Sequence, residues 1–364
     1  MVDARDRDLL QRAFRLAERG RGHTSPNPIV GAVIASRDGT IVGEGYHHAA
    51  GTPHAEVHAL EAAGERSRGA VLYCTLEPCC HTGRTGPCAE RIATAGITRV
   101  VAAVRDPNPL VAGGGFGYLR AHGIEVEEDV APREAARQNA AFFTFMRAGR
   151  PFVLFKAAVS LDGRIAAARG ERTRISGLEA QRDVQRLRAE MDAIAIGSGT
   201  VLVDDPLLSV RDVYRVRPFA RVIFDRRLRT PPTARMFGTT ADGPIILLAA
   251  AAAVRDSTAS ADALRDAGAQ IEAIEDGSVT AALGRLGELG LTSLLLEGGA
   301  ALSAAAWDAG MIDRVRLYVA PAPLGSAGVP LLDGRPFSTA DLYDRRVEPC
   351  GDDVLIEGDV HRID

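Results

Sequence analysis

Most of the side chains able to bind a metal ion lie in one short part of the sequence. Four of the five cysteines fall within fifteen residues, at positions 74, 79, 80 and 88, and His54 and Glu56 precede them in a His-Ala-Glu tripeptide. Clustered cysteines in a chain without secretory features indicate metal binding more often than disulfides. The first expectation is therefore a metal site that combines imidazole and thiolate.

His54, Cys79 and Cys88 match the ligands of a catalytic zinc site. Such a site uses three protein ligands and leaves the fourth position to water. Glu56 lies at the start of the same predicted helix as His54, where its carboxylate is placed to move protons to and from that water. His-x-Glu followed by Pro-Cys-x-x-Cys is the signature of zinc nucleobase deaminases, although here the two cysteines are nine residues apart instead of three.

Two neighbours compete for these roles. Cys80 is a rival to Cys79, which we favour because it directly follows Pro78 at the end of a predicted strand, as in the signature. His81 is a further donor, but a fourth protein ligand would close the site and abolish catalysis. Two cysteines at this spacing are also compatible with a structural zinc clip, so a binding protein that uses a structural zinc stays open at this point.

The elements that position these residues form a layered α/β domain over residues 1–148. Apolar periodicity and turn signals predict helices over residues 6–19, 54–63, 88–95 and 132–146, and strands over 29–35, 41–46, 71–76 and 99–104. The segment Arg-Ala-Gly-Arg-Pro at 147–151 is the expected domain boundary.

A second α/β domain is predicted over residues 151–364. Strands are expected at 152–159, 193–197, 221–224, 244–248, 293–296, 315–319 and 354–357, and helices at 178–190, 261–267, 280–289 and 301–308. The glycines of Glu-Gly-Gly-Ala-Ala-Leu at 297–302 let backbone amides at a helix N-terminus approach a phosphate. A Gly-x-Gly-x-x-Gly does not occur at a first strand, which argues against a standard Rossmann dehydrogenase.

Several motifs of the first half resemble the deaminase half of the bifunctional riboflavin-biosynthesis deaminase–reductases. They are Pro-Asn-Pro-Ile-Val-Gly at 26–31, Gly-Thr-Pro-His-Ala-Glu-Val at 51–57, Thr-Leu-Glu-Pro-Cys at 75–79, Gly-Arg-Thr at 83–85 and Pro-Cys at 87–88. That family has a long loop between its two cysteines, which accounts for the wide spacing. It usually has Thr-Pro-Pro-Cys where this chain has Thr-Gly-Pro-Cys at 85–88.

Residues 151–364 resemble the reductase half of the same family, so the likeness covers both halves in the family's order. The resemblance implies a cytidine-deaminase-like three-layer domain followed by a dihydrofolate-reductase-like α/β domain. It also implies two successive reactions, with Zn²⁺ and NADPH as cofactors. Zinc hydrolysis would deaminate 2,5-diamino-6-ribosylamino-4(3H)-pyrimidinone 5′-phosphate, and NADPH would then reduce the ribosyl group to ribityl.

The resemblance also carries over site residues, motif by motif. It places NADPH at Ala158, Arg174, Thr200, Asp204, Asp225, Gly299, Ala300, Ala301 and Leu302. It places the phosphoribosyl substrate at Arg172, Arg188, Leu208, Arg211 and Glu297. The family often has Trp just before the position of Ile175, where this chain has Arg174, so an aromatic cofactor contact is lost there.

Two further residues are singled out by their rarity or surroundings. Asn27 stands between two prolines, and its amide is expected to read the pyrimidine edge; the alternative is an Asx turn. Lys156 is the only lysine among 43 basic side chains, and an ammonium gives up a proton far more readily than a guanidinium. We therefore expect Lys156 to act in the reduction, with Asp162 as a less certain partner. The alternative is a salt bridge on an exposed strand end.

Composition argues against other classes of protein. The net charge is −4, so the chain lacks the basic footprint of a nucleic-acid-binding protein. No apolar run reaches the ~18 residues of a membrane-spanning helix, and the charged N-terminus predicts a cytoplasmic protein. The runner-up function is a zinc nucleoside or tRNA-type deaminase fused to a non-catalytic module. The oligomeric state stays open, a homo-oligomer included.

Overall fold

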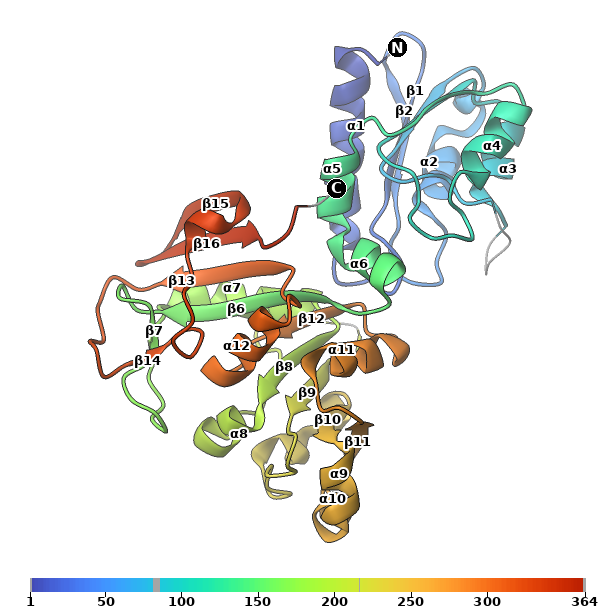
Figure 1. The fold of residues 1–364 in the computed structure, drawn as a ribbon. Helices are drawn as coiled ribbons and strands as arrows, with labels where there is room; N and C mark the ends of the chain where they lie inside the picture. The colour runs from blue at the N-terminus through green and yellow to red at the C-terminus, as the bar shows by residue number, and fades with distance from the viewer. Residues whose placement is uncertain (1, 81–85, 216, 363–364) are drawn as a thin grey trace. The chain divides into compact units, whose positions relative to one another are not determined.

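The computed structural model describes residues 2–80, 86–215 and 217–362. Contacts within the chain divide it into two compact units, one running to Ala148 and the other comprising Gly149–Arg362. Each unit has its own sheet (Figure 1). Among the described residues, no helix is long and apolar enough to cross a membrane.

The first unit is built on a five-stranded sheet of order β2-β1-β3-β4-β5. Its strands are β1 (Gly31–Ala35), β2 (Ile41–Tyr46), β3 (Val71–Cys74), β4 (Arg99–Ala102) and β5 (Glu125–Glu127). Its helices are α1 (Ala4–Ala17), α2 (Ala55–Ala63), α3 (Cys88–Thr94), α4 (Gly114–Ala121), α5 (Pro132–Gln138) and α6 (Ala140–Ala148). Strand β1 is antiparallel to β2 and β3, whereas β3, β4 and β5 are parallel.

Alternate residues of β1 face two different cores, which makes this unit three-layered. Ala32 and Ile34 pack with residues of α2, α3 and α4, while Val33 and Ala35 pack with α1. Strand β2 carries Gly43 and Gly45 where α2 lies against it. A Cβ at these positions would lie 2.2 and 2.3 Å from backbone oxygens of α2, so only glycine permits this close packing.

The second unit is built on a nine-stranded sheet of order β11-β10-β9-β8-β12-β6-β13-β16-β15. Its strands are β6 (Phe152–Val159), β8 (Ala193–Gly197), β9 (Ala220–Phe224), β10 (Ile245–Ala250), β11 (Ala269–Ile274), β12 (Ser293–Leu296), β13 (Arg314–Val319), β15 (Tyr343–Cys350) and β16 (Asp353–Asp359). The strands from β11 to β13 are parallel, and β16 and β15 complete the sheet in antiparallel pairing. A separate pair joins β7 (Arg164–Ala166) to β14 (Val329–Pro330).

Helices of the second unit follow most of the parallel strands. They are α7 (Leu178–Glu190), α8 (Ser198–Asp204), α9 (Ala251–Asp256), α10 (Thr258–Asp266), α11 (Val279–Glu288) and α12 (Ala300–Asp308). Short 3₁₀ helices occur in both units: at Glu18–Gly20 and Gly64–Ser67 in the first, and at Arg235–Asp242 and Thr339–Asp341 in the second. Because the strands are parallel, their carboxyl ends, where β8 leads into α8 and β12 into α12, share one edge of the sheet.

Several predicted elements differ from the structure. The single helix predicted over 132–146 is wrong, because it breaks at Asn139, whose side chain bonds the backbone of Ile29 instead of facing solvent. The strand predicted at 71–76 ends at Cys74. Several elements were not predicted. Helix α4 was missed because it starts in a run of three glycines, and α8, β5, β11 and β15 were missed because their apolar periodicity is weak.

Candidate active sites

Three elements of the first unit bring a histidine and two cysteines together. His54 immediately precedes α2, Cys79 follows β3, and Cys88 begins α3. The Nδ1 atom of His54 lies 3.2 Å from Cys88 Sγ and 3.5 Å from Cys79 Sγ. Tetrahedral zinc with metal–ligand bonds of roughly 2.0–2.3 Å requires N and S atoms about 3.5 Å apart, so the donor set fits that ion.

The pKa shifts of these side chains also favour metal binding. Hydrogen bonds from the Cys88 thiol and from His54 lower the pKa of Cys79 to about 4, although burial opposes them. The bond to Cys79 together with burial raises the pKa of Cys88, and the bond with Cys79 raises the pKa of His54. One thiolate is thus already favoured beside the imidazole, and the thiolate is the form of cysteine that binds metal.

The structure does not add the two rival ligands, Cys80 and His81, to this donor group. Cys80 is not in the group of three donors, and its Sγ lies 4.0 Å from the backbone oxygen of Val111. His81 lies outside the described residues. In the part of the chain that the structure describes, His54, Cys79 and Cys88 are the group of three whose ligand atoms lie within 4.8 Å of one another.

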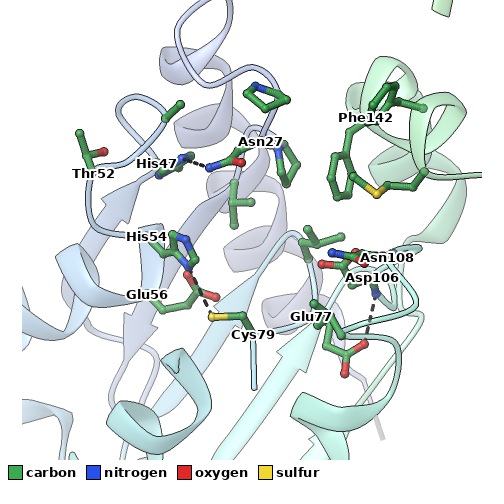
Figure 2. A pocket seen from close by; sticks show the side chains of 18 of the residues that line it. Asn27, His47, Thr52, His54, Glu56, Glu77, Cys79, Asp106, Asn108 and Phe142 are labelled. Atoms are coloured by element: carbon green, nitrogen blue, oxygen red, sulfur yellow. Dashed lines mark hydrogen bonds between the residues drawn. The ribbon is translucent and has the colours of Figure 1, made fainter. Parts of the chain in front are cut away.

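Glu56 lies in the first turn of α2, beside His54 and Cys79 (Figure 2). Only 3% of the residue is exposed, and this burial raises the pKa of Glu56 to about 7. A carboxyl group poised near neutral pH both accepts and donates a proton, which is what general acid–base catalysis requires.

His54, Cys79 and Glu56 line a cavity of about 480 Å³. Polar side chains line one part of it and an apolar wall from α6 lines another (Figure 2). The polar residues are Asn27, His47, Thr52, Glu77, Asp106 and Asn108, and the apolar wall consists of Phe142, Phe145 and Met146. A flat, polar-edged heterocycle suits such a lining.

Asn27 lies in this cavity, where a histidine holds it. The Nδ2 atom of Asn27 lies 3.4 Å from Nε2 of His47, whose Nδ1 lies 3.2 Å from the backbone oxygen of Pro53. Since a carbonyl only accepts, Nδ1 of His47 carries the proton and Nε2 accepts from Asn27. Burial lowers the pKa of His47, which keeps the ring neutral. Asn139 supports the same segment by bonding both backbone groups of Ile29, at 2.8 and 3.0 Å.

A second polar loop was missed by sequence reasoning. Asp106 and Asn108 line the cavity, and the backbone N–H of Asn108 donates to Asp106 at 2.8 Å. Burial raises the pKa of Asp106 to about 6. The buried carboxylate of Glu77 anchors this loop by accepting from the backbone N–H groups of Asp106, Gly113, Gly115 and Phe116 at 2.9–3.2 Å. Asn108 has a sequence signal: Pro-Asn-Pro occurs at 26–28 and again at 107–109.

In the second unit, Lys156 joins two of the residues assigned to the substrate. Its Nζ lies 3.8 Å from Glu297, and Arg188 bonds the same carboxylate twice, at 2.8 and 2.9 Å. Burial would raise the pKa of Glu297, but Arg188 and Lys156 lower it to about 2. The expected alternative for Lys156 is half right: the salt bridge exists, but it lies in the middle of the sheet with only 14% of the lysine side chain exposed.

The other predicted residues of this unit are distributed over several of its elements. Ala158 is on β6, Thr200 and Asp204 are on α8, Asp225 follows β9, and Gly299 to Leu302 form the start of α12. Arg172 and Arg174 precede α7, and Arg172 lies close enough to Asp204 to lower its pKa against the rise caused by burial. Leu208 and Arg211 lie in the loop after α8, which Arg188 and Gln185 tie to α7.

Asp162 is not brought to Lys156. Its carboxylate accepts from Ser160 Oγ at 2.6 Å and from the backbone N–H groups of Leu324 and Gly325 at 2.9 and 2.8 Å. These contacts give Asp162 the structural task of fastening the turn after β6 to the segment after β13.

Both halves of the chain match known protein families. Residues 3–104 match the cytidine and deoxycytidylate deaminase zinc-binding region, and residues 151–356 match the RibD C-terminal domain. The chain is 40% identical over 335 residues to the riboflavin biosynthesis protein RibD of Escherichia coli K12, covering 88% of this chain and 89% of that protein. It is 41% identical over 364 residues to RibD of Haemophilus influenzae, covering 96% and 95%.

Solved structures are similar over nearly the whole chain. RibD from Acinetobacter baumannii has a TM-score of 0.84 and 38% identity, with 98% of each chain covered. A diaminohydroxyphosphoribosylaminopyrimidine deaminase/5-amino-6-(5-phosphoribosylamino)uracil reductase from Thermotoga maritima has a TM-score of 0.83 and 34% identity, with 97% of this chain and 98% of that chain covered. The predicted α/β fold of both halves is thereby confirmed.

Proposed function

The chain belongs to the RibD family of bifunctional riboflavin-biosynthesis enzymes, and on that premise we propose how its residues divide two reactions. It is a bifunctional enzyme: a zinc-dependent deaminase and an NADPH-dependent reductase in one chain carry out two successive steps of riboflavin biosynthesis. The match of residues 151–356 to a RibD domain argues against the alternative of a non-catalytic second module. The proposed domains are residues 1–148 and 151–364.

In the proposed deamination, His54, Cys79 and Cys88 would hold zinc. Zinc supplies an activated water at neutral pH, because it lowers the pKa of bound water from 15.7 to roughly 7. Glu56 takes a proton from the attacking water and delivers protons to the ring nitrogen and to the leaving ammonia. Asn27 binds the ring edge, His47 holds Asn27, and the apolar wall of α6 excludes water from the ring face.

One observation carries the deaminase assignment: the ligand atoms of His54, Cys79 and Cys88 lie within 4.8 Å of one another, and the buried Glu56 carboxyl lines the same cavity as His54 and Cys79. The test is incubation of the protein with the diaminopyrimidine phosphate, with and without NADPH, followed by mass analysis. Without NADPH we expect a product in which one amino group has become an oxygen function. With NADPH we expect that product to gain two hydrogens, and failure of the first conversion would contradict the proposal.

In the proposed reduction, bound NADPH would supply a hydride for C1 of the ribosyl group. The bond between C1 and the ring oxygen must break to open the sugar, and a proton must reach the ring oxygen or the nitrogen. Lys156 is the proposed proton donor, and Glu297 holds its ammonium with help from Arg188. Arg172, Leu208 and Arg211 are proposed to bind the phosphoribosyl part of the substrate. NADPH is proposed to bind along Ala158, Arg174, Thr200, Asp204, Asp225 and the turn from Gly299 to Leu302.

Replacing Cys79 with Ser is expected to remove most of the bound zinc. Even residues that only hydrogen-bond to a metal ligand contribute roughly 10–100-fold in affinity, so loss of a thiolate ligand should cost at least that. Metal analysis of the purified variant measures the effect. Cys80→Ser is the matched control and should keep its zinc. Full zinc in Cys79→Ser, with loss in Cys80→Ser, would reverse the assignment.

Replacing Asn27 with Ala is expected to raise KM for deamination by roughly fivefold or more, the effect of losing one hydrogen bond worth about 1 kcal/mol. Zinc content and reduction of the deaminated intermediate should not change, because Asn27 is not one of the three metal donors and the proposed reductase residues belong to the second unit. Steady-state kinetics and metal analysis provide these values. An unchanged KM combined with a lower melting temperature would favour the Asx-turn interpretation.

The compartment and assembly are also proposals. Unpaired cysteines at a metal site require a reducing environment, which supports the cytoplasm. The exposed strand β15 ends the nine-stranded sheet, and such an edge is a template for pairing with a second copy in a homo-oligomer. Light scattering on the purified protein measures the assembly, and a monomer would contradict it.

A further inference from the structure

Lys156 shares one face of the large sheet with residues of the neighbouring strand β13. Its neighbours on β6, Phe155 and Ala157, pack into the core on the other face, so Lys156 points the opposite way. Strand β13 lies beside β6, and its Arg316 is the residue paired with Lys156 (Figure 1). Tyr318 stands two residues further along β13, so it lies on the same face as Lys156.

Tyr318 is fully buried on this face, and both packing and hydrogen bonds fix its ring. The ring packs with Ala180 and Val184 of α7. Its hydroxyl donates to Asp183 Oδ2 at 2.5 Å, and Arg316 Nη2 donates to the same oxygen at 2.7 Å. Arg316 Nε also donates to the hydroxyl oxygen of Tyr318 at 3.2 Å. The ring therefore cannot swing away without breaking hydrogen bonds to both α7 and β13.

The ammonium of Lys156, by contrast, has no short contact with a carboxylate. Its Nζ lies 3.8 Å from Glu297, beyond hydrogen-bond distance, and it donates no hydrogen bond among the described residues. Glu297 accepts from Arg188 instead, at 2.8 and 2.9 Å. The Nζ atom also lies 5.8 Å from the centre of the Tyr318 ring. A cation within about 6 Å of a ring centre is attracted to the face of that ring.

The groups around Lys156 act on its charge in opposite directions. Burial and Arg188 of α7 lower the pKa of Lys156, and Glu297 at the end of β12 raises it. Arg316 is a second cation on this face, but it is paired with Glu357 of β16 at 2.8 Å. The tyrosine ring adds a neutral contact that favours the charged form of the lysine, and such contacts are stronger at buried positions.

The proposed reduction also needs NADPH, and the second unit fits that cofactor. A Cβ on Gly299 would lie 3.4 Å from Thr200 Oγ1, so this glycine leaves backbone amides at the start of α12 open to a phosphate. The buried Oδ1 atom of Asp204 has no hydrogen-bond partner among the described residues, as expected of a group that awaits a ligand.

We infer that Tyr318 is a positioning residue for the reduction: its ring, fixed by Asp183 and Arg316, holds the Lys156 ammonium in place. The inference rests on the proposed role of Lys156 as proton donor and adds the group that orients it. A compact ammonium on a flexible four-carbon chain needs a second contact to fix its direction. The ring supplies that contact without a charge that would compete for the proton.

The test uses the fact that Lys156 is the only lysine of the chain. Protein labelled with ¹³C at the lysine Cε gives a single side-chain NMR signal, and its change with pH measures the pKa of Lys156. A nearby ring face moves the signals of the adjacent hydrogens upfield. In Tyr318→Leu we expect this upfield displacement to disappear. The pKa of Lys156 should fall by about one pH unit, which corresponds to about 1.4 kcal/mol and is typical of a buried contact between a cation and a ring.

The rate of reduction should follow the same change. Lys156 is proposed to act in its protonated form, so the alkaline fall in rate should begin about one pH unit lower in Tyr318→Leu, with deamination unchanged. Tyr318→Phe keeps the ring and should keep the upfield signal, the pKa and the pH profile. Leu317→Val, on the opposite face of β13, is the control for a merely destabilised second unit: its melting temperature should fall and the Lys156 signal should not move.

Separate results would overturn the inference and the proposed function. An unchanged signal and pKa in Tyr318→Leu would show that the ring does not hold Lys156, and an equal loss in Tyr318→Phe would assign the effect to the hydroxyl instead. A wild-type signal at the position of free lysine would overturn the inference even if Tyr318→Leu does not fold. If the wild-type signal is upfield but Lys156→Arg reduces the intermediate at the parent rate, the contact exists and the proposed proton donor is wrong.

Discussion

Glu56→Gln is expected to keep its zinc and to deaminate 10²–10⁴-fold more slowly or worse, the usual contribution of a positioned acid–base group. Glutamine preserves the size and the hydrogen-bonding reach of the side chain but cannot carry a proton between water, ring nitrogen and ammonia. His54, Cys79 and Cys88 are the proposed zinc ligands, so none of them is expected to take over this proton transfer. Turnover of the diaminopyrimidine phosphate at saturating concentration measures the effect.

The controls for this variant are in the same helix and in the other unit. Glu61→Gln changes an exposed carboxylate of α2 and should deaminate at the parent rate. The Glu56→Gln variant should also reduce the deaminated intermediate at the normal rate, since the residues proposed for the reduction belong to the second unit. Deamination by Glu56→Gln within a fewfold of the parent, with zinc present, would refute the proton-shuttle role.

The group of three donors was accessible from sequence because its chemistry is local. His54 and Glu56 are two residues apart, Cys79 follows β3 and Cys88 begins α3, so residue type and spacing alone identify them as candidates. The choice between Cys79 and Cys80 rested on the proline that ends the strand. The structure adds the 3.2 and 3.5 Å distances from His54 to the two sulfur atoms.

The rest of the deaminase cavity depends on contacts between distant segments. Glu77 holds the loop of Asp106 with backbone hydrogen bonds, and no local pattern shows that a carboxylate will be buried for that purpose. The chain has only three asparagines, and all three belong to this region: Asn27 and Asn108 line the cavity, and Asn139 bonds Ile29. Because asparagine is so rare in this chain, each asparagine in the sequence could have been examined as a candidate for this region.

In the second unit, sequence placed residues near one another but did not show which of them pair. Arg188 and Glu297 were both assigned to the substrate, yet they form a bidentate ion pair 109 positions apart in the sequence. Helix α7 carries Arg188 across the carboxyl end of β12, where Glu297 begins, and that proximity follows from the strand order β8-β12-β6. Strand order is a property of the whole sheet, which periodicity within one segment does not reveal.

Lys156 is the proposed proton donor for the reduction. Its ammonium is held between the carboxylate of Glu297 at 3.8 Å and the ring of Tyr318, whose centroid is 5.8 Å away. Burial lowers the pKa of Lys156, Glu297 opposes that effect, and Arg188 adds to it. A lysine with a lowered pKa releases a proton more readily, whereas arginine stays charged throughout the accessible pH range.

We therefore expect Lys156→Arg to reduce the deaminated intermediate 10²–10⁴-fold more slowly while deamination is unchanged. NADPH binding, followed by its fluorescence, should persist and shows that the second unit is folded. The pH profile separates chemistry from structure. The lysine enzyme needs its protonated form, so its rate should fall as the pH rises through that pKa, and the arginine variant should lack this alkaline fall. If the variant reduces the intermediate at the parent rate, Lys156 is a structural partner of Glu297, and its being the only lysine reflects chance.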